Sequence, residues 1–228
     1  LDGIRQLVQA GRYDDAIRSV RSTDPAGWDD ASRDALEKLG VTARWGKFGT
    51  EIREAEALLK NRKYAESERA AAEAAGACAN QAEVRRFMEE AAKKFPSAEW
   101  YLAVQAQDEP DLRRVVRAAG AGHPSAWRMA GRTVLPGQAV PGLDVRPAVA
   151  VPYLQRAADA DHPEAARDLG TWYSLGDEVR APDPDLAKKW FRKAAELGVS
   201  AALVDLGDLN LRFSGRPGFS DAEAVKAY

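Results

Sequence analysis

Two histidines are the side chains in this sequence best suited to metal binding or to acid–base catalysis. His123 and His162 each stand directly before a proline, at corresponding positions of an internal repeat. They are a whole repeat apart, and no second pair of ligands follows either of them at helical spacing. A structural place at the start of a helix accounts for both residues. We therefore predict no metal site and no catalytic role for the histidines.

The remaining reactive side chains are predicted to have structural and not catalytic roles. Cys78 is the only cysteine, so an internal disulfide and a four-cysteine zinc site are both excluded. Its alanine-rich surroundings, residues 74–79, lack the cation that a reactive thiolate needs, which predicts a small buried apolar residue. Adjacent acidic residues diverge by about 100° on a helix and do not converge on a substrate. We therefore predict no catalytic residue and no cofactor. The acidic pairs are predicted to lie on solvated helix faces or at helix starts: Asp14-Asp15, Asp29-Asp30 and Glu89-Glu90.

The six tryptophans raise the question of a stacking surface for a sugar or a peptide. Trp172 and Trp190 follow the apolar spacing of the repeat, and Trp127 lies on the corresponding helix of an earlier unit. These three are predicted to be core residues. Trp45 lies within residues 40–49, which begin and end with glycine and are predicted to form a connection. It is the best surface candidate among the tryptophans.

Composition sets the class of protein. Of 228 residues, 45% are apolar and 30% are charged, a balance typical of a folded soluble domain. Alanine is abundant, and no sustained alternation of β-branched and polar residues is present, so helices are predicted throughout. The net charge of −2 comes from interleaved acids and bases and argues against a nucleic-acid binder. No apolar run reaches the roughly 18 residues of a membrane-spanning helix.

An internal repeat organises the second half of the chain. Residues 150–170 align with residues 187–207 at an offset of 187 − 150 = 37 residues, with large apolar residues matched in size and position. Residues 117–131 align with residues 156–170 at an offset of 39, and the Gly- and Pro-rich residues 132–147 are predicted to form an enlarged loop. The matched pairs include Ala150 with Ala187, Tyr153 with Trp190, Leu154 with Phe191, and Gly170 with Gly207.

The chain ends suggest a longer natural protein. Residues 224–228 fall on residues 187–191 at the same 37-residue offset, which predicts the start of another repeat. A half-built unit would leave an apolar face uncovered, so the natural protein is expected to continue beyond Tyr228. The sequence begins with leucine and shows no signal-peptide pattern, as expected of a processed start or of a piece of a longer chain.

Each repeat is predicted to be two helices joined by a tight turn. Residues 150–158 carry apolar side chains at i, i+3, i+4, i+7 and i+8, the spacing of one helix face. Pro163 is favoured in the first turn of the second helix. One hairpin alone cannot bury these stripes, whereas stacked hairpins share a core. The predicted fold is an all-α, α/α superhelical solenoid of stacked antiparallel helix hairpins.

At this point a family can be named by resemblance. Residues 187–198, Ala-Lys-Lys-Trp-Phe-Arg-Lys-Ala-Ala-Glu-Leu-Gly, closely resemble the Sel1-like repeat, a member of the tetratricopeptide-like superfamily. The resemblance covers residues 111–228 as repeats at about 111–149, 150–186 and 187–223, with a departure at residues 210–220. Residues 11–17 resemble the middle of a tetratricopeptide repeat, and residues 7–13 recur at 58–64. Residues 1–110 are therefore predicted to form degenerate tetratricopeptide-like hairpins that continue into the same superhelix.

The resemblance implies a binding role for the concave face of the solenoid, which first helices line. Basic side chains recur on the predicted first helices and suit an acidic peptide or another polyanion. Solvated helix faces with cations near the helix ends would explain the same residues. The predicted partner-binding residues are Arg113, Arg117, Arg156, Lys189, Arg192 and Lys193.

The favoured function is a non-enzymatic scaffold or adaptor of bacterial origin that binds other proteins. A more specific version is an envelope scaffold for exopolysaccharide secretion, since such proteins combine tetratricopeptide-like and Sel1-like units. On that reading the periplasm or envelope is favoured over the cytoplasm. One alternative is a regulatory interaction region of a larger signalling protein. The other is an enzyme acting on cell-wall material or sugars, which would need converging polar residues that the sequence does not supply.

Overall fold

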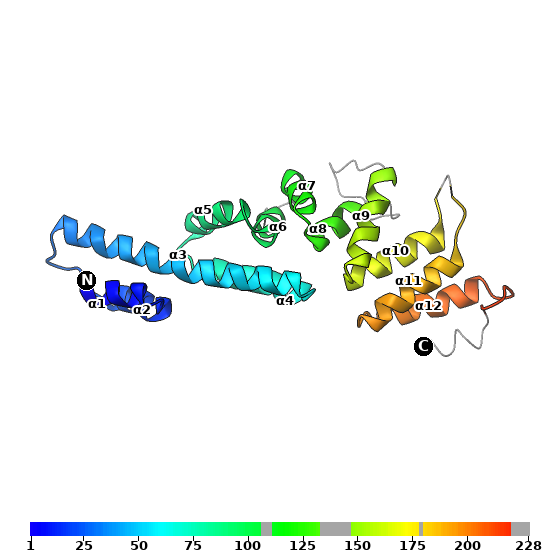
Figure 1. Ribbon diagram of the computed structural model, residues 1–228, viewed down its shortest axis with the longest axis horizontal. Coiled ribbons are helices and arrows are strands. Elements are labelled where there is room, and N and C mark those ends of the chain that lie inside the picture. The colour runs from blue at the N-terminus through cyan, green and yellow to red at the C-terminus, as the bar shows by residue number, and fades with distance from the viewer. Residues whose placement is uncertain (106–110, 133–146, 178–179, 220–228) are drawn as a thin grey trace. The chain divides into compact units, whose positions relative to one another are not determined.

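The computed structural model describes residues 1–105, 111–132, 147–177 and 180–219 (Figure 1). Every regular element within these ranges is an α-helix, which confirms the predicted all-α class. The chain divides into two compact units, Leu1–Asp111 (unit 1) and Leu112–Tyr228 (unit 2). Nearly all of the predicted loop at residues 132–147 and the predicted start of a repeat at 224–228 lie outside the described residues.

Unit 1 is built around one long helix. A short hairpin packs against the first half of the long helix, while the later helices pack against its second half. The helices of unit 1 are α1 (Asp2–Gln9), α2 (Tyr13–Ser22), α3 (Asp30–Lys60), α4 (Tyr64–Gly76), α5 (Gln81–Ala92) and α6 (Pro96–Val104).

The predicted connection at residues 40–49 is wrong, because helix α3 runs through it without a break. The glycines that suggested a loop instead let the first hairpin approach α3 closely. A Cβ atom at Gly46 would lie 2.2 Å from the Tyr13 ring of α2, and one at Gly40 would lie 3.2 Å from Val20. Glycine costs about 1 kcal/mol in a helix interior, and close packing offsets that cost.

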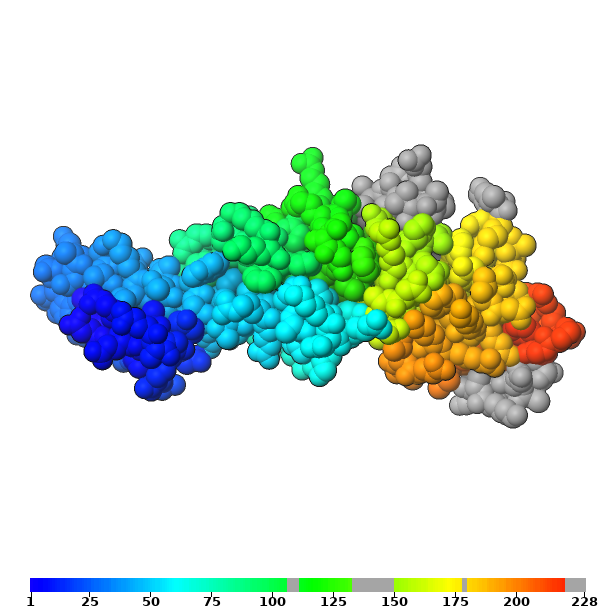
Figure 2. All heavy atoms as spheres, in the orientation of Figure 1, coloured from blue at the N-terminus to red at the C-terminus, as the bar shows by residue number. Residues whose placement is uncertain are grey.

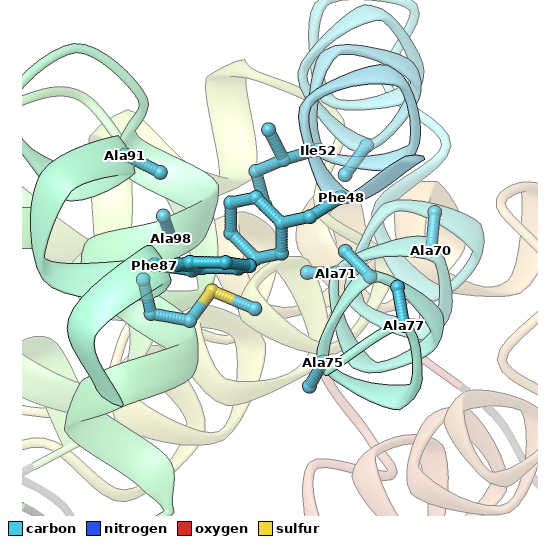
Figure 3. Close-up of a cluster of buried hydrophobic side chains, with 12 residues drawn as sticks. Phe48, Ile52, Ala70, Ala71, Ala75, Ala77, Phe87, Ala91 and Ala98 are labelled. Atoms are coloured by element: carbon cyan, nitrogen blue, oxygen red, sulfur yellow. The ribbon is translucent and has the colours of Figure 1, made fainter. Parts of the chain in front are cut away.

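The core of unit 1 combines a few large side chains with many alanines (Figure 3). Phe48 and Ile52 of α3 and Phe87 of α5 are almost completely buried. Alanines of α4 face them, and the missing side-chain bulk lets α3 and α4 lie close together. The alanine-rich composition thus serves helix packing as well as helix propensity.

Unit 2 consists of helical hairpins stacked side by side, with α9 in yellow-green and α10 to α12 in yellow to orange (Figure 2). Each helix packs against the one before and the one after it, as expected of a solenoid. The helices are α7 (Leu112–Gly120), α8 (Pro124–Gly131), α9 (Pro147–Asp159), α10 (Pro163–Leu175), α11 (Pro184–Glu196) and α12 (Ala201–Arg212).

One type of turn closes hairpins in both units. A residue with positive φ follows the first helix, and the next backbone N–H donates to a carbonyl five residues earlier, as in the Schellman motif. Residues 7–13 and 58–64, predicted to be equivalent, share this turn. The residues with positive φ are Gly11 (70°), Arg62 (61°), Gly122 (96°), Asp161 (62°) and Gly198 (94°).

Two glycines of unit 2 act as seats for large side chains of the next helix. A Cβ atom at Gly131 of α8 would lie 2.4 Å from Leu154 of α9. A Cβ atom at Gly170 of α10 would lie 2.6 Å from the Phe191 ring of α11. Because Leu154 and Phe191 are equivalent residues, successive hairpins are joined by the same contact.

Substitution of Gly170 by alanine will destabilise unit 2. The new methyl group would overlap the ring of Phe191, which is 3% exposed and has little room to move. Overpacking of this kind costs about 1–3 kcal/mol. Urea denaturation of Gly170→Ala measures the loss, and Gly49→Ala, where the nearest atom is the end of a flexible arginine at 3.5 Å, is the control. Equal urea midpoints for the two variants would show that Phe191 does not require a glycine at position 170.

Candidate protein-binding surface

The six predicted partner-binding residues lie on the first helices of unit 2. Arg113 and Arg117 lie on α7, Arg156 on α9, and the other three on α11. The structure leaves five of them exposed and Lys193 half-buried. Their role in binding, and their place on a concave face, remain predictions.

Lys193 differs from the others because the fold already uses its charge. Its Nζ atom donates to the carbonyl oxygen of Ala158 at 2.7 Å and lies 2.7 Å from Oδ1 of Asp161. Both acceptors belong to the turn between α9 and α10, so Lys193 ties α11 to the preceding hairpin. Binding a partner would require this contact to be broken, which makes Lys193 the weakest member of the predicted set.

Repeat offsets show how far the basic residues recur. With offsets of 39 and 37 residues, Arg117, Arg156 and Lys193 are equivalent. The counterpart of Arg113 and Lys189 on α9 is Pro152, so that position is not basic in every repeat. One basic position therefore recurs through three hairpins, and in the third hairpin it serves an internal contact.

Acidic side chains interrupt the exposed faces of the later first helices. On α11 the exposed residues at i, i+4, i+7 and i+11 are Asp185, Lys189, Arg192 and Glu196, whose charges sum to zero. Helix α7 has no acidic residue, and its exposed cations flank Val116, which is 52% exposed. The cationic character is therefore concentrated on α7 and on the middle of α11.

The buried histidines belong to the turns. His123 is 1% exposed and His162 is 7% exposed, at the N-termini of α8 and α10. Nδ1 of His162 accepts a hydrogen bond from the backbone N–H of Ala165 at 3.3 Å. Burial, followed by the charge of His162, lowers the pKa of His123 to about 3. Burial, followed by the charge of Arg128, lowers the pKa of His162 to about 4, so both rings are neutral at pH 7.

Comparison with known protein families identifies the architecture. The Sel1 repeat family matches residues 123–162 and 163–199. Residues 123–199 are therefore similar to two consecutive Sel1 repeats. The first matched segment begins at His123 and the second at Pro163, so each starts at a second helix and ends after the next first helix. Each segment therefore contains one complete seat, such as Gly170 with Phe191.

Two similar solved structures have the same fold. One is a protective antigen from uropathogenic Escherichia coli with an SLR fold, at 17% identity and a TM-score of 0.56, aligned over 99% of this chain and 53% of the antigen. The other is a Sel1 repeat protein from Oxalobacter formigenes, at 20% identity and a TM-score of 0.51, aligned over 99% of this chain and 93% of that protein. This chain thus spans about half the length of the antigen.

Ion pairs between the second helices of the Sel1-like repeats were not predicted from the sequence. Nε of Arg128 on α8 donates to Asp168 on α10 at 2.6 Å. One repeat later, Arg167 on α10 binds Asp205 on α12 through both Nε and Nη2, at 2.5 and 3.2 Å. The repeat offsets could have indicated these pairs, because both partners recur at repeat spacing: Arg128 and Arg167 (167 − 128 = 39), and Asp168 and Asp205 (205 − 168 = 37). These pairs fix the register between hairpins.

The tryptophans divide largely as predicted. Trp172 and Trp190 are 8% and 6% exposed, and Trp127 is half-buried against the same cluster. Trp45 is 38% exposed, as expected of a surface residue, but it lies on helix α3 and not in a loop.

The cysteine and the acidic residue Asp29 both have structural roles. Cys78 is half-buried against the core of unit 1, and burial together with the charge of Glu83 raises the pKa of its thiol to about 11. Asp29 caps α3 by accepting a hydrogen bond from the Ser32 backbone N–H at 2.6 Å. Among the described residues, no three His, Cys, Asp or Glu side chains come together as a metal site. None of the helices in this part of the chain has the length and apolar character needed to cross a membrane.

Proposed function

We propose that this chain is a non-enzymatic scaffold whose first helices in unit 2 bind acidic segments of other proteins. Sel1-like repeat proteins generally mediate protein–protein interactions, and the Sel1 repeats of this chain make that role the default expectation. The observation that carries the proposal is the exposure of Arg156 and Arg192 on successive first helices, α9 and α11. Arg113 and Arg117 of α7 and Lys189 of α11 extend the basic surface.

The proposed partner is a protein assembly of the bacterial envelope, such as one that secretes exopolysaccharide. Its support is the combination of tetratricopeptide-like turns in unit 1 with Sel1-like repeats in unit 2. Both similar solved structures come from bacteria, in keeping with a bacterial origin. The identity of the captured partner distinguishes this assembly from the regulatory region of a signalling protein.

A pull-down from the host organism tests the scaffold role. The double variant Arg156→Glu, Arg192→Glu should recover about tenfold less of a partner that the wild-type chain captures, because opposite charges then become like charges. The matched control is Arg53→Glu, Arg69→Glu, two exposed arginines of unit 1 with the same change in net charge. Equal recovery by all three proteins would dismiss the basic surface, and the absence of any reproducible partner would dismiss the scaffold role.

A further inference from the structure

Trp45 presents part of a rigid aromatic ring to solvent at the seam between α3 and α5. Its ring stacks on Phe48 at 5.4 Å with an interplanar angle of 13°. It also meets the Phe87 ring edge-on at 4.6 Å and 68°. Both phenylalanines are buried in the core of unit 1 (Figure 3), so the indole is fixed on one side and 38% exposed on the other. A partner would lose little side-chain entropy on binding a ring that is already held in place.

An exposed guanidinium group lies beside the Phe87 ring, which Trp45 contacts. Arg86 lies over the Phe87 ring at 5.1 Å, and its side chain is 63% exposed. The Glu83 carboxylate is bound on both oxygens by Arg44, at 2.7 and 3.0 Å. Nη2 of Arg86 lies only 3.9 Å from the same carboxylate. Two guanidinium groups thus share one carboxylate, and its side-chain hydrogen bonds go to Arg44, while Arg86 stays at 3.9 Å and is largely exposed.

We propose that Trp45 and Arg86 form a second docking site, for an acidic peptide segment that carries an apolar side chain. The proposal rests on the scaffold role and places part of the binding in unit 1. The apolar side chain covers Trp45, while a neighbouring carboxylate pairs with Arg86. Tryptophan and arginine are the residues most enriched among those that dominate binding energy at interfaces.

Charge also argues against a second copy of the chain as the occupant. In a twofold-symmetric contact the same patch meets itself, so the partner copy would bring a second exposed Arg86 to this small patch. Each copy would bring the same exposed guanidinium, and like charges disfavour the contact. An acidic partner instead supplies a carboxylate for Arg86.

Fluorescence anisotropy with synthetic peptides tests the site on the full chain. The probe is a short labelled peptide of aspartate and glutamate residues with two central leucines, and the comparison peptide has serines in place of the leucines. The wild-type chain should bind the leucine peptide about tenfold more tightly than the serine peptide. Trp45→Ala should weaken binding of the leucine peptide about tenfold, and Arg86→Glu should do so about fivefold.

Controls separate this site from loss of folding and from the surface on unit 2. Arg69→Glu, at an exposed arginine of α4, matches the charge change of Arg86→Glu and should bind as the wild type does. Unchanged helical circular dichroism of Arg86→Glu keeps the test valid even if Trp45→Ala unfolds the chain. Equal binding of the two peptides, unchanged binding by Arg86→Glu, or no binding by the wild type would overturn the proposal. Binding lost only in Arg156→Glu, Arg192→Glu would overturn it while leaving the scaffold role intact.

Discussion

Lowering the pH from about 7.5 to about 5 is expected to destabilise unit 2 by several kcal/mol while affecting unit 1 much less. Both histidines of the chain lie in unit 2, buried at the N-termini of α8 and α10. Helix N-termini carry partial positive charge, so a protonated imidazole is disfavoured there as well as by burial. Acid should therefore loosen the hairpins that contain the Sel1 repeats.

The loss of stability in acid follows from the lowered pKa values of the two histidines. In the unfolded chain a histidine protonates near pH 6.5. Burial lowers the pKa to about 3 for His123 and about 4 for His162, so the folded state stays neutral at pH 5. Below pH 6.5 the unfolded state thus binds more protons than the folded state, and stability falls. The loss is roughly 2 kcal/mol per histidine at pH 5 and levels off only below the folded pKa values.

Asparagine variants provide the control for the acid effect. Asparagine caps helix N-termini well and does not titrate, so His123→Asn, His162→Asn should fold and lose most of the pH dependence. Urea denaturation followed by amide NMR signals from each unit compares the two units in one sample. An equal loss of stability between pH 7.5 and 5 in the wild type and the double variant would show that other groups cause it.

Replacement of Glu83 by alanine is expected to destabilise unit 1 by about 3–5 kcal/mol, the usual effect of breaking a buried ion pair. Glu83 is 7% exposed and holds the Arg44 guanidinium, which is 16% exposed. Its Oε2 atom also accepts the backbone N–H of Ala79 at 2.6 Å. Burial raises the pKa of Glu83, but the hydrogen bonds and nearby arginines outweigh it, so the pKa lies below its ordinary value. Alanine would leave both the guanidinium and the Ala79 N–H without this acceptor.

Two further variants isolate the contribution of the charge at position 83. Glu83→Gln keeps an acceptor of the same shape and should cost clearly less than Glu83→Ala. Arg44→Leu, Glu83→Leu removes both charges and should recover much of the stability lost by Glu83→Ala. Hydrogen exchange in peptides from α3 and α5 reports on the affected region. A loss below about 1 kcal/mol for Glu83→Ala would mean that Arg44 finds other partners.

The core of unit 2 could be predicted from sequence because its information is local and periodic. Leu154 and Phe191 stand 37 residues apart, and both are buried at equivalent places in the fold. The prediction failed at residues 40–49 because the glycines of α3 are explained by contacts with Tyr13 and Val20, which are distant in sequence. Local glycine content cannot distinguish a turn from a site of close helix packing.

The charged contacts were harder to predict, since they depend on single substitutions between repeats. Lys193 and Arg156 are equivalent, yet only Lys193 finds an aspartate, Asp161, in the preceding turn. The counterpart of Asp161 one hairpin earlier is Gly122, so Arg156 has no such carboxylate at that place. Arg44 and Glu83 lie 39 residues apart in unit 1, where no period relates them. Only the three-dimensional structure brings such residues together.

The glycine seats define which piece of this chain could be transplanted as a module. A cut in the turn between a first helix and its second helix, such as α9 and α10, would keep Gly170 with Phe191, whereas a cut between α10 and α11 would separate them. Leucine packs against Gly131 and phenylalanine against Gly170. A cut between α10 and α11 would therefore pair a glycine with a side chain from another repeat, which leaves either a void or a clash. Shuffled or lengthened versions of the solenoid should therefore exchange segments that begin with a second helix, such as residues 163–199.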